Sequence, residues 1–288
     1  MIMVPGVHGL TEPHELNDSD FKAVVDLVYR QAGITLGQNK RNLLIARLSH
    51  RVRELGFTDF SQYVAFVTSR RSSHDELRQL VNAVTTNTTH FFREQHHFAF
   101  LDRYLRNKAS NRQIEKRKLR IWCAASSTGQ EPYSIAITLH KAFSGRSGWD
   151  VKILASDIDT NALHIASEGV YTAEEMRNVP TQDKAKFFSF SEETRMHTIT
   201  PAIRKHVVFR KVNLIYDALD FHEPIDVIFC RNVMIYFSAE NRAMLLSKLH
   251  RTLAQDGLLF LGHSESIPFA DRKFEYVDTT VYRKRDAK

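Results

Sequence analysis

Polar side chains follow three apolar segments in the second half of the chain, where strand-like runs alternate with helix-length segments. Glu131 lies in the turn after LRIWCA, Asp157 comes directly after VKILAS, and Arg231 and Asn232 follow IDVIFC. In a doubly wound parallel sheet, ligands collect at the carboxyl ends of the strands. An acid after the second strand typically accepts hydrogen bonds from ribose hydroxyls. We therefore expect a site for an adenosine-type ligand at this edge.

The same residues also have simpler structural interpretations. The segment CAASSTGQEPYS contains neither GK[ST] nor G-x-G-x-x-G, so a strand-to-helix turn that binds nothing is the alternative. Of the two acids in SDID, we assign Asp159 to the helix N-cap and Asp157 to the ligand. A buried Arg231 needs a partner, and a salt bridge within the protein would supply one without any ligand.

Hydroxyl and amide side chains crowd the segment VTTNTTHFFRE upstream of these strands. Asn87, Thr88 and Thr89 are candidates for reaching the ligand, and Arg93 follows four residues after Thr89. Five consecutive side chains of this kind fit the end of a helix poorly, because they compete with the backbone for hydrogen bonds. Capping would explain them singly, but a ligand explains them together with the strand ends.

The elements that must position these residues fall into two domains. Residues 1–102 carry short apolar stripes at helical spacing, and Ser73 with Glu76 forms a capping box, so this part is predicted to be helical. Residues 103–120 hold eight basic residues and one acid, and we predict a solvated basic linker over 103–118. Residues 119–288 predict an α/β domain with a small inserted β subdomain at about 171–212 and a closing antiparallel pair, FEYVDTT with VYRKR.

The strings TTNTTHFFRE, WCAASSTGQEPYSIAI, ASDID, VNL and IFCRNVMIYF, in this order, closely resemble the CheR family of chemotaxis methyltransferases. The resemblance runs from about Asp18 to Arg285. It implies an α/β fold of the class I S-adenosylmethionine-dependent methyltransferases, a Rossmann-like doubly wound sheet, with an all-α N-terminal domain and a small antiparallel β subdomain inserted. It also implies transfer of a methyl group from S-adenosylmethionine to glutamate side-chain carboxylates of chemoreceptors. The products would be glutamate methyl esters and S-adenosylhomocysteine, in sensory adaptation.

The resemblance further implies roles for individual residues. Arg93 and Tyr236 should face the transferred methyl group as the catalytic residues. A glutamate carboxylate is already ionised near neutral pH, so no general base is needed and positioning is the main task. We expect Arg93 to hold the carboxylate oxygen that does not attack. The implied cofactor contacts are Asn87, Thr89, Arg93, Glu131, Asp157, Asn213, Leu214, Arg231 and Asn232.

A basic helix is predicted in the segment KRNLLIARLSHRVRELG. Its apolar stripe consists of Leu44, Leu48, Val52 and Leu55. At about 100° per residue, Arg47, His50 and Arg53 fall on the opposite face. A solvated face is the ordinary interpretation of such charge. The family resemblance instead favours receptor binding by these three residues, against the acidic cytoplasmic methylation helices of chemoreceptors.

Some members of this family hold a peptide from the receptor C-terminus as an extra strand on the β subdomain. In those members a glycine-containing loop joins the first strands of the subdomain, whereas residues 188–196 here contain no glycine. A turn with positive φ is hard to build from such residues. Glu192 and Glu193 would also repel an acidic tail. We therefore predict that this protein does not depend on the peptide tether.

Composition narrows the partners and the location. Forty basic against thirty-three acidic residues give a net charge of +7, which suggests an acidic partner. The chain offers CRNVMIYF where a nucleic-acid methyltransferase would carry an N-P-P-Y-like motif, so nucleic acid is not the expected substrate. His90, His96 and His97 match no metal-binding spacing, so no metal is expected.

Cysteine content and hydropathy point to the cytoplasm. Two cysteines cannot form a disulfide framework, the opening residues lack the features of a secretory signal, and about 18 consecutive apolar residues occur nowhere. We expect a cytoplasmic monomer with no direct membrane insertion. The alternative from outside the enzyme class is a regulatory module that binds the cofactor without turnover.

Overall fold

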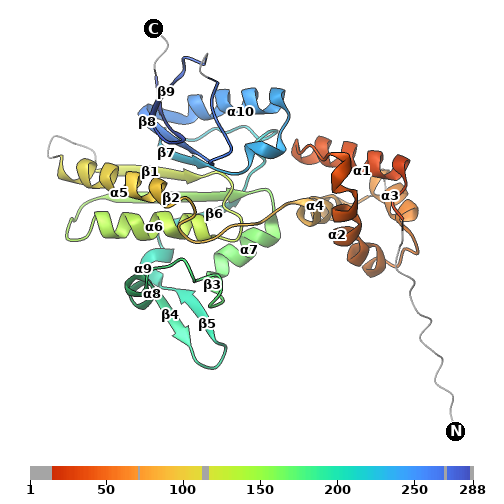
Figure 1. Ribbon diagram of the computed structural model, residues 1–288, viewed down its shortest axis with the longest axis horizontal. Helices are drawn as coiled ribbons and strands as arrows, with labels where there is room; N and C mark the ends of the chain where they lie inside the picture. The colour runs from red at the N-terminus through yellow and green to blue at the C-terminus, as the bar shows by residue number, and fades with distance from the viewer. Residues whose placement is uncertain (1–14, 71, 112–116, 269–270, 286–288) are drawn as a thin grey trace. The chain divides into compact units, whose positions relative to one another are not determined.

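The computed structural model describes residues 15–70, 72–111, 117–268 and 271–285. The chain forms two compact units, Met1–Thr85 and Thr86–Lys288. The first unit is helical in its described part (Figure 1). Its elements are α1 (Asp18–Ala32), the 3-10 helix η1 (Gln38–Lys40), α2 (Arg41–Glu54), α3 (Phe60–Thr68) and α4 (His74–Val84).

Apolar residues at helical spacing build the core of this unit. The stripe of α2 consists of Leu44, Leu48 and Val52, which are fully buried and pack with α1, α3 and α4. Leu55, which the sequence placed in the same stripe, is 38% exposed. The reason is that α2 ends at Glu54 and the chain turns through Gly56, whose φ is +77°.

A buried carboxylate joins three helices of the first unit. Ser73 caps α4 as predicted, because its side chain accepts the N–H of Glu76 at 3.0 Å. The Glu76 carboxylate is buried and accepts hydrogen bonds from Arg51 Nε at 2.9 Å and from the Tyr63 hydroxyl at 3.0 Å. Burial and the charge of Glu76 raise the pKa of Tyr63. The network therefore links the arginine–glutamate pair and the Tyr63 phenol between α2, α3 and α4.

The second unit is an α/β domain. Its first half comprises α5 (Gln95–Ser110), β1 (Lys118–Cys123), α6 (Gln130–Ala142), β2 (Asp150–Asp157), α7 (Thr160–Glu168), β3 (Val170–Tyr171) and α8 (Thr181–Phe187). The middle comprises β4 (Phe188–Ser191), β5 (Met196–Ile199), α9 (Pro201–Arg204), β6 (Val207–Lys211), β7 (Ile225–Cys230) and the 3-10 helix η2 (Met234–Tyr236). The last elements are α10 (Ala239–Thr252), β8 (Leu253–Leu261), β9 (Phe274–Asp278) and β10 (Val281–Lys284).

In the described part of this unit, seven strands form one sheet in the order β6-β2-β1-β7-β8-β10-β9. The five strands from β6 to β8 are parallel, whereas β10 runs antiparallel to β8 and β9 antiparallel to β10. This is the doubly wound sheet that the alternation of strands and helices predicted, with the predicted closing pair at its end. A separate antiparallel sheet has the order β3-β5-β4 and projects from the domain in Figure 1.

Helix α5 occupies much of the segment that we expected to be a linker. Phe98, Leu101 and Leu105 on α5 pack with α6 and the strands in one apolar core, and Lys108 bonds Asp226 at 3.0 Å. The helix was missed because residues 103–110 are highly charged and because α5 buries only about one apolar residue in each turn. The predicted boundary at residue 102 thus falls inside α5, and the two compact units divide at residue 85. Of the rest of the segment, residues 112–116 lie outside the described residues.

The predicted β subdomain is smaller than expected at its C-terminal end. Residues 207–211 form β6, which pairs in parallel with β2 at the edge of the main sheet and buries Val207. The small sheet contains β4, which follows α8 without a loop and was not predicted. A short run such as FSFS shows only two alternations, so its strand character depends on pairing with β5.

Candidate active site

The strand ends bring the predicted polar residues to one edge of the main sheet. Cys123, the last residue of β1, pairs in register with Ala155 of β2 and with Phe229 of β7. Because the three strands are parallel neighbours, the loops that follow them meet at this edge. Glu131 lies in the first turn of α6, Asp157 is the last residue of β2, and Arg231 directly follows β7, so all three lie at the strand ends as the sequence predicted.

Arg231 lies at the centre of the site, with a side chain that is 0% exposed. Its Nη1 donates to Glu131 Oε2 at 2.7 Å, and its Nη2 lies 3.2 Å from Glu94 Oε2. Nη2 also donates to the backbone oxygen of Arg93 at 2.6 Å. One buried cation therefore faces two carboxylates, so the salt bridge that we weighed as an alternative for Arg231 exists.

The charges of this cluster shift its acid–base equilibria. Burial works against the ionised form of Glu94, but Arg231 and the hydrogen bonds from His263 outweigh it and lower the pKa to about 2. Burial raises the pKa of Glu131, and Arg231 opposes that change. The thiol of Cys123 donates to Glu131 Oε1 at 3.2 Å, and burial raises the pKa of this thiol. Cys123 thus serves as a neutral donor to the carboxylate.

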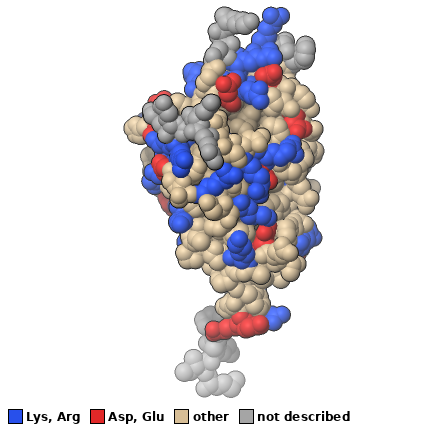
Figure 2. All heavy atoms as spheres, turned by 90° about the vertical axis from the view of Figure 1, so that its left-hand side faces the viewer, with Lys and Arg blue, Asp and Glu red and all other residues tan. Residues whose placement is uncertain are grey.

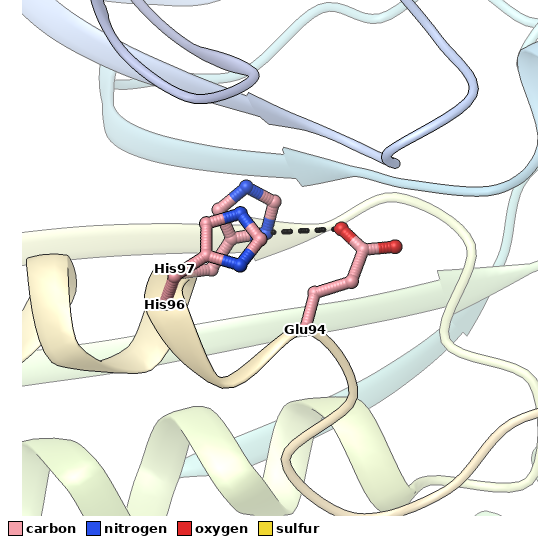
Figure 3. Close-up of side chains that lie close together, drawn as sticks. All are labelled: Glu94, His96 and His97. Carbon is pink, nitrogen blue, oxygen red and sulfur yellow. Dashed lines mark ion pairs between the residues drawn. The ribbon is translucent and has the colours of Figure 1, made fainter.

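Glu94 was not predicted from the sequence, and it adopts an unusual backbone conformation with φ +59° just before α5. Figure 3 shows its carboxylate turned toward the ring of His97, whose Nδ1 lies 3.4 Å from Glu94 Oε2. With His96, the three residues offer atoms within 4.8 Å of one another that could ligate a metal. The same oxygen of Glu94 already contacts Arg231.

His97 is best explained as a buried packing residue. It is 0% exposed, and its Nε2 lies 3.1 Å from Thr279 O and 2.9 Å from Thr280 Oγ1. Burial, together with Arg231 and His96, lowers the pKa of His97 to about 4, so the ring is neutral at pH 7. A further cation beside Arg231 would be repelled, which disfavours a metal.

Asp157 organises the loops after β1 and β2. Its Oδ2 accepts the N–H of Ser127 at 2.8 Å and its Oδ1 accepts the N–H of Asp159 at 3.0 Å. Asp159 caps α7 as predicted, and its other oxygen accepts Asn87 Nδ2 at 2.6 Å. Burial raises the pKa of Asp157, while the backbone hydrogen bonds from Asp159 and Ser127 oppose that change. The carboxylate of Asp157 has about four lone-pair sites, and the backbone hydrogen bonds do not use all of them, so it can still accept from a ligand.

The segment upstream of α5 belongs to the second unit and is irregular, not helical, over residues 86–94. Asn87 contacts the loop after β1, since Ser127 Oγ donates to its backbone oxygen at 3.1 Å. Thr89 and Arg93 are half-buried, and Arg93 Nη1 donates to Thr88 O at 3.0 Å. Arg93 is near enough to Glu131 for its charge to oppose part of the rise in pKa that burial causes.

The predicted residues after β6 and β7 have defined structural partners. Asn213 Oδ1 accepts the N–H of Ile215 at 3.0 Å and so forms its own turn, and Leu214 is buried. Lys248 donates to the Ile215 oxygen at 2.6 Å and thereby fastens this turn to α10. Asn232 has φ +57°, and Tyr236 is half-buried at the end of η2.

The donor and acceptor set at this edge fits S-adenosylmethionine. Four buried polar atoms of this region have no hydrogen-bond partner among the described residues: Ser126 Oγ, Arg231 Nε, Glu94 Oε2 and His97 Nδ1. The free lone pairs of Asp157 suit ribose hydroxyls, and the buried arginine and glutamate side chains suit a ligand that carries both a carboxylate and an amino group. These are the polar groups that the cofactor presents.

The face of α2 that we expected to be free is partly engaged. Arg47 is half-buried and its Nη1 donates to the backbone oxygen of Val84 at 2.9 Å, and also to that of Thr85. It therefore satisfies carbonyl groups at the end of α4. His50 is 81% exposed and lies 3.7 Å from Glu54, whereas Arg53 is half-buried. The outward-facing part of this surface is centred on His50.

The turn between β4 and β5 forms without glycine. Arg195 adopts φ +58° in this turn, and its guanidinium lies 5.7 Å from the centroid of the Phe190 ring. Phe190 is 44% exposed and also contacts the ring of His197. The expectation that these residues could hardly form a turn with positive φ is wrong, because Arg195 adopts such a φ. Its guanidinium also contacts the Phe190 ring.

Basic side chains gather on the face of the second unit that turns to the left in Figure 1, as Figure 2 shows. Near the start of β1, Lys118 contacts Glu223, and Arg120 Nε bonds the same carboxylate at 3.0 Å. Acidic neighbours thus balance part of the positive charge. No helix in the described residues combines the length and the apolar character needed to cross a membrane.

Comparison with known proteins covers both units. Residues 19–85 match the CheR methyltransferase all-alpha domain, and residues 87–283 match the CheR methyltransferase SAM binding domain. The chain is 38% identical over 276 residues to the chemotaxis protein methyltransferase of Escherichia coli (strain K12), which covers 95% of this chain and 93% of that protein. It is 41% identical over 279 residues to the chemotaxis protein methyltransferase 2 of Pseudomonas aeruginosa, covering 96% of each. A chain in which an all-α domain precedes a SAM-binding domain of this kind along nearly its full length belongs to the CheR family, the S-adenosylmethionine-dependent methyltransferases of chemotaxis.

Proposed function

We propose that this protein transfers a methyl group from S-adenosylmethionine to glutamate side-chain carboxylates of chemoreceptors, as a protein-glutamate O-methyltransferase of sensory adaptation. The observation that carries the proposal is Arg93 beside the strand-end carboxylates. Among the described residues, its guanidinium makes one hydrogen bond, to Thr88 O, so further N–H groups are available to an anionic substrate. A planar fork of donors suits a carboxylate.

The cofactor would be held by the residues that meet at the strand ends. When bound, S-adenosylmethionine supplies an electrophilic methyl group on a sulfonium. Asp157 would accept from ribose hydroxyls. The proposed contacts are Asn87, Thr89, Arg93, Glu131, Asp157, Asn213, Leu214, Arg231 and Asn232, and S-adenosylhomocysteine would use the same set.

The protein's own contribution to the chemistry is orientation and exclusion of water. The substrate glutamate is ionised at neutral pH, so no side chain has to remove a proton. Arg93 and Tyr236 hold the carboxylate, with Arg93 on the oxygen that does not attack. A strong contact to the attacking oxygen would stabilise its charge and weaken it as a nucleophile. Interactions of this kind matter mainly in the transition state.

Receptor docking is proposed for the exposed surface of α2. His50 and Arg53 would face the acidic methylation helices of the receptor, and Arg47 would support them by holding the end of α4. Docking would not require the C-terminal receptor peptide, since Glu192 and Glu193 in the turn of the small sheet oppose an acidic tail. The working form would be a cytoplasmic monomer that binds neither nucleic acid nor the bilayer.

The test is incubation with tritium-labelled S-adenosylmethionine and receptor-enriched membranes, followed by release of label in alkali, which hydrolyses methyl esters. We expect alkali-labile label on the receptors with the natural protein and a large loss with Arg93→Ala. Arg103→Ala is the matched control, because Arg103 is 65% exposed on α5. Label that resists alkali would contradict ester formation. Binding of the cofactor with no transfer to any receptor would favour the regulatory module.

A further inference from the structure

The segment Gly262–Glu265 follows β8 and has no role in the function proposed above. Its sequence GHSE lacks the surroundings of a serine nucleophile. Because β7 and β8 are parallel neighbours, with Cys230 opposite Leu261, this segment lies beside the loop that carries Arg231, Asn232 and Tyr236. Two contacts join the two loops directly, and a third connects them through Glu94.

The first contact is a buried carboxylate that accepts three backbone N–H groups. Glu265 is 5% exposed. Its Oε2 accepts the N–H of Asn232 at 2.8 Å and that of Gly262 at 2.7 Å, and its Oε1 accepts the N–H of Met234 at 2.7 Å. Charge-assisted hydrogen bonds of this length are strong, and a buried carboxylate needs them. Glu265 thus holds the chain on both sides of Val233.

The second contact is a close approach that only glycine allows. A Cβ atom at Gly262 would lie 2.4 Å from Asn232 Nδ2 and 2.8 Å from the Asn232 backbone nitrogen. Asn232 itself has φ +57°, a conformation that needs support from its surroundings. The absence of a side chain at residue 262 therefore lets the two loops touch where Asn232 turns.

The third contact reaches the side chain of Arg231. The backbone N–H of His263 donates to Glu94 Oε1 at 3.2 Å, and its Nδ1 lies 3.1 Å from the same oxygen. The other oxygen of Glu94 faces the guanidinium of Arg231. The GHSE segment therefore acts on Arg231 through Glu94 and on the backbone after Arg231 through Glu265.

We propose that Gly262, His263 and Glu265 form a positioning clamp, which holds the Arg231–Tyr236 loop in the geometry needed to bind S-adenosylmethionine and to orient the substrate carboxylate. The clamp residues touch neither substrate nor cofactor and act through Arg231, Asn232 and the backbone of Met234. The inference rests on the proposed role of this loop in methyl transfer.

Glu265→Gln is the sharpest variant, because it preserves shape and removes one acceptor. Three N–H groups converge on two oxygens, so a glutamine amide turns an NH₂ group toward at least one of these donors. Gly262→Ala tests the close approach with the carboxylate intact. Ser264→Ala is the matched control, since Ser264 is exposed in the middle of the same segment.

Affinity for S-adenosylmethionine is measured by titration calorimetry without receptor, and turnover is measured with saturating cofactor. For Glu265→Gln and Gly262→Ala we expect affinity at least about tenfold weaker and a further fall in kcat at saturation, whereas Ser264→Ala should match the natural protein. A merely structural role would lower the thermal midpoint and leave both quantities unchanged in the folded protein. Natural affinity and kcat in both variants would overturn the clamp.

The cofactor titration separates the two proposals. A failure of receptor methylation by the natural protein would refute the proposed function, whereas the cofactor affinities of the variants would still test the clamp. If neither variant folds, amide hydrogen exchange can test the clamp in the natural protein. Its methionines, six in all, can be labelled with ¹⁵N, and we expect the Met234 amide to exchange slowly in deuterated water. Exchange at the rate of an open loop would overturn the proposal.

Discussion

Replacement of Arg231 by methionine tests the charge arrangement of the site most directly. The side chain is 0% exposed and stands between Glu131 at 2.7 Å and Glu94 at 3.2 Å. Removing it leaves two buried carboxylates without their cation, and breaking a buried pair in this way costs about 3–5 kcal/mol. For a unit of the size of the second one, a loss of about 1 kcal/mol in the free energy of unfolding lowers the thermal unfolding midpoint by about 2–4 °C. We therefore expect this midpoint to fall by roughly 6–20 °C at pH 7.

The loss should shrink in acid. In the natural protein the pKa of Glu94 is lowered to about 2, so its stabilising contribution is complete above the ordinary carboxyl range and disappears as the pH falls toward 2. In Arg231→Met, burial without a cation should raise the pKa of both carboxyl groups above the unfolded value. Protonation then neutralises the two carboxylates of the variant as the pH falls. The stabilities of the two proteins should therefore converge below about pH 4.5.

Tryptophan fluorescence follows this unit selectively, because both tryptophans of the chain, Trp122 and Trp149, lie in it. Arg283→Met is the control, since Arg283 is 44% exposed and lies 3.7 Å from Glu275, a surface pair worth about 1 kcal/mol at most. A fall of less than 2 °C for Arg231→Met, or an equal loss at pH 7 and pH 4.5, would refute the charge argument.

Three further outcomes are expected. Asp157→Ala should weaken S-adenosylmethionine binding by about 1–3 kcal/mol in titration calorimetry, and natural affinity in a folded variant would remove Asp157 from the site. Arg93→Ala should lower kcat by a larger factor than it weakens cofactor binding, which single-turnover rates at saturation can check, and an unchanged rate would exclude the orienting role. His50→Glu with Arg53→Glu should slow receptor methylation at low salt and less so at high salt, while Arg30→Glu, an exposed charge on α1, should not; equal effects of the two charge reversals would return the α2 face to ordinary solvation.

Removal of the receptor C-terminal tail should leave the methylation rate nearly unchanged. The reason is the pair Glu192 and Glu193, which opposes an acidic peptide beside β4. Rates on full-length and truncated receptors, measured at equal receptor concentration, provide the check. Low-micromolar binding of the isolated tail peptide would contradict this prediction.

Local chemistry explains what could be predicted from the sequence. Asp159 was assigned correctly to the cap of α7 because a cap depends on its own helix. The alternation of apolar strands with helices predicted a parallel sheet, and a parallel sheet must bring its carboxyl ends to one edge. Glu131, Asp157 and Arg231 were therefore identified as neighbours. Glu131 and Arg231, which form the ion pair, are 100 positions apart in the sequence.

Contacts between distant segments decided the rest. Glu94 and Glu265 were missed as site residues, since nothing within a few positions of either indicates that one faces Arg231 and the other fastens Asn232. The position of Glu94 directly after Arg93 was the one local feature that could have suggested a role in the site. The backbone partners of Arg47 were missed for the same reason, because they lie at the end of α4, far from Arg47 in the sequence.

The sequence alone thus determined the alternation of elements, the caps and the family, because each depends on short strings or on periodicity. The tertiary structure decided that α5 packs into the core, that β6 extends the main sheet, and that one arginine serves two buried carboxylates. Burial is the physical reason. A charged side chain acquires its partner and its shifted pKa only when the fold removes it from water, and no local pattern records which distant group will replace that water.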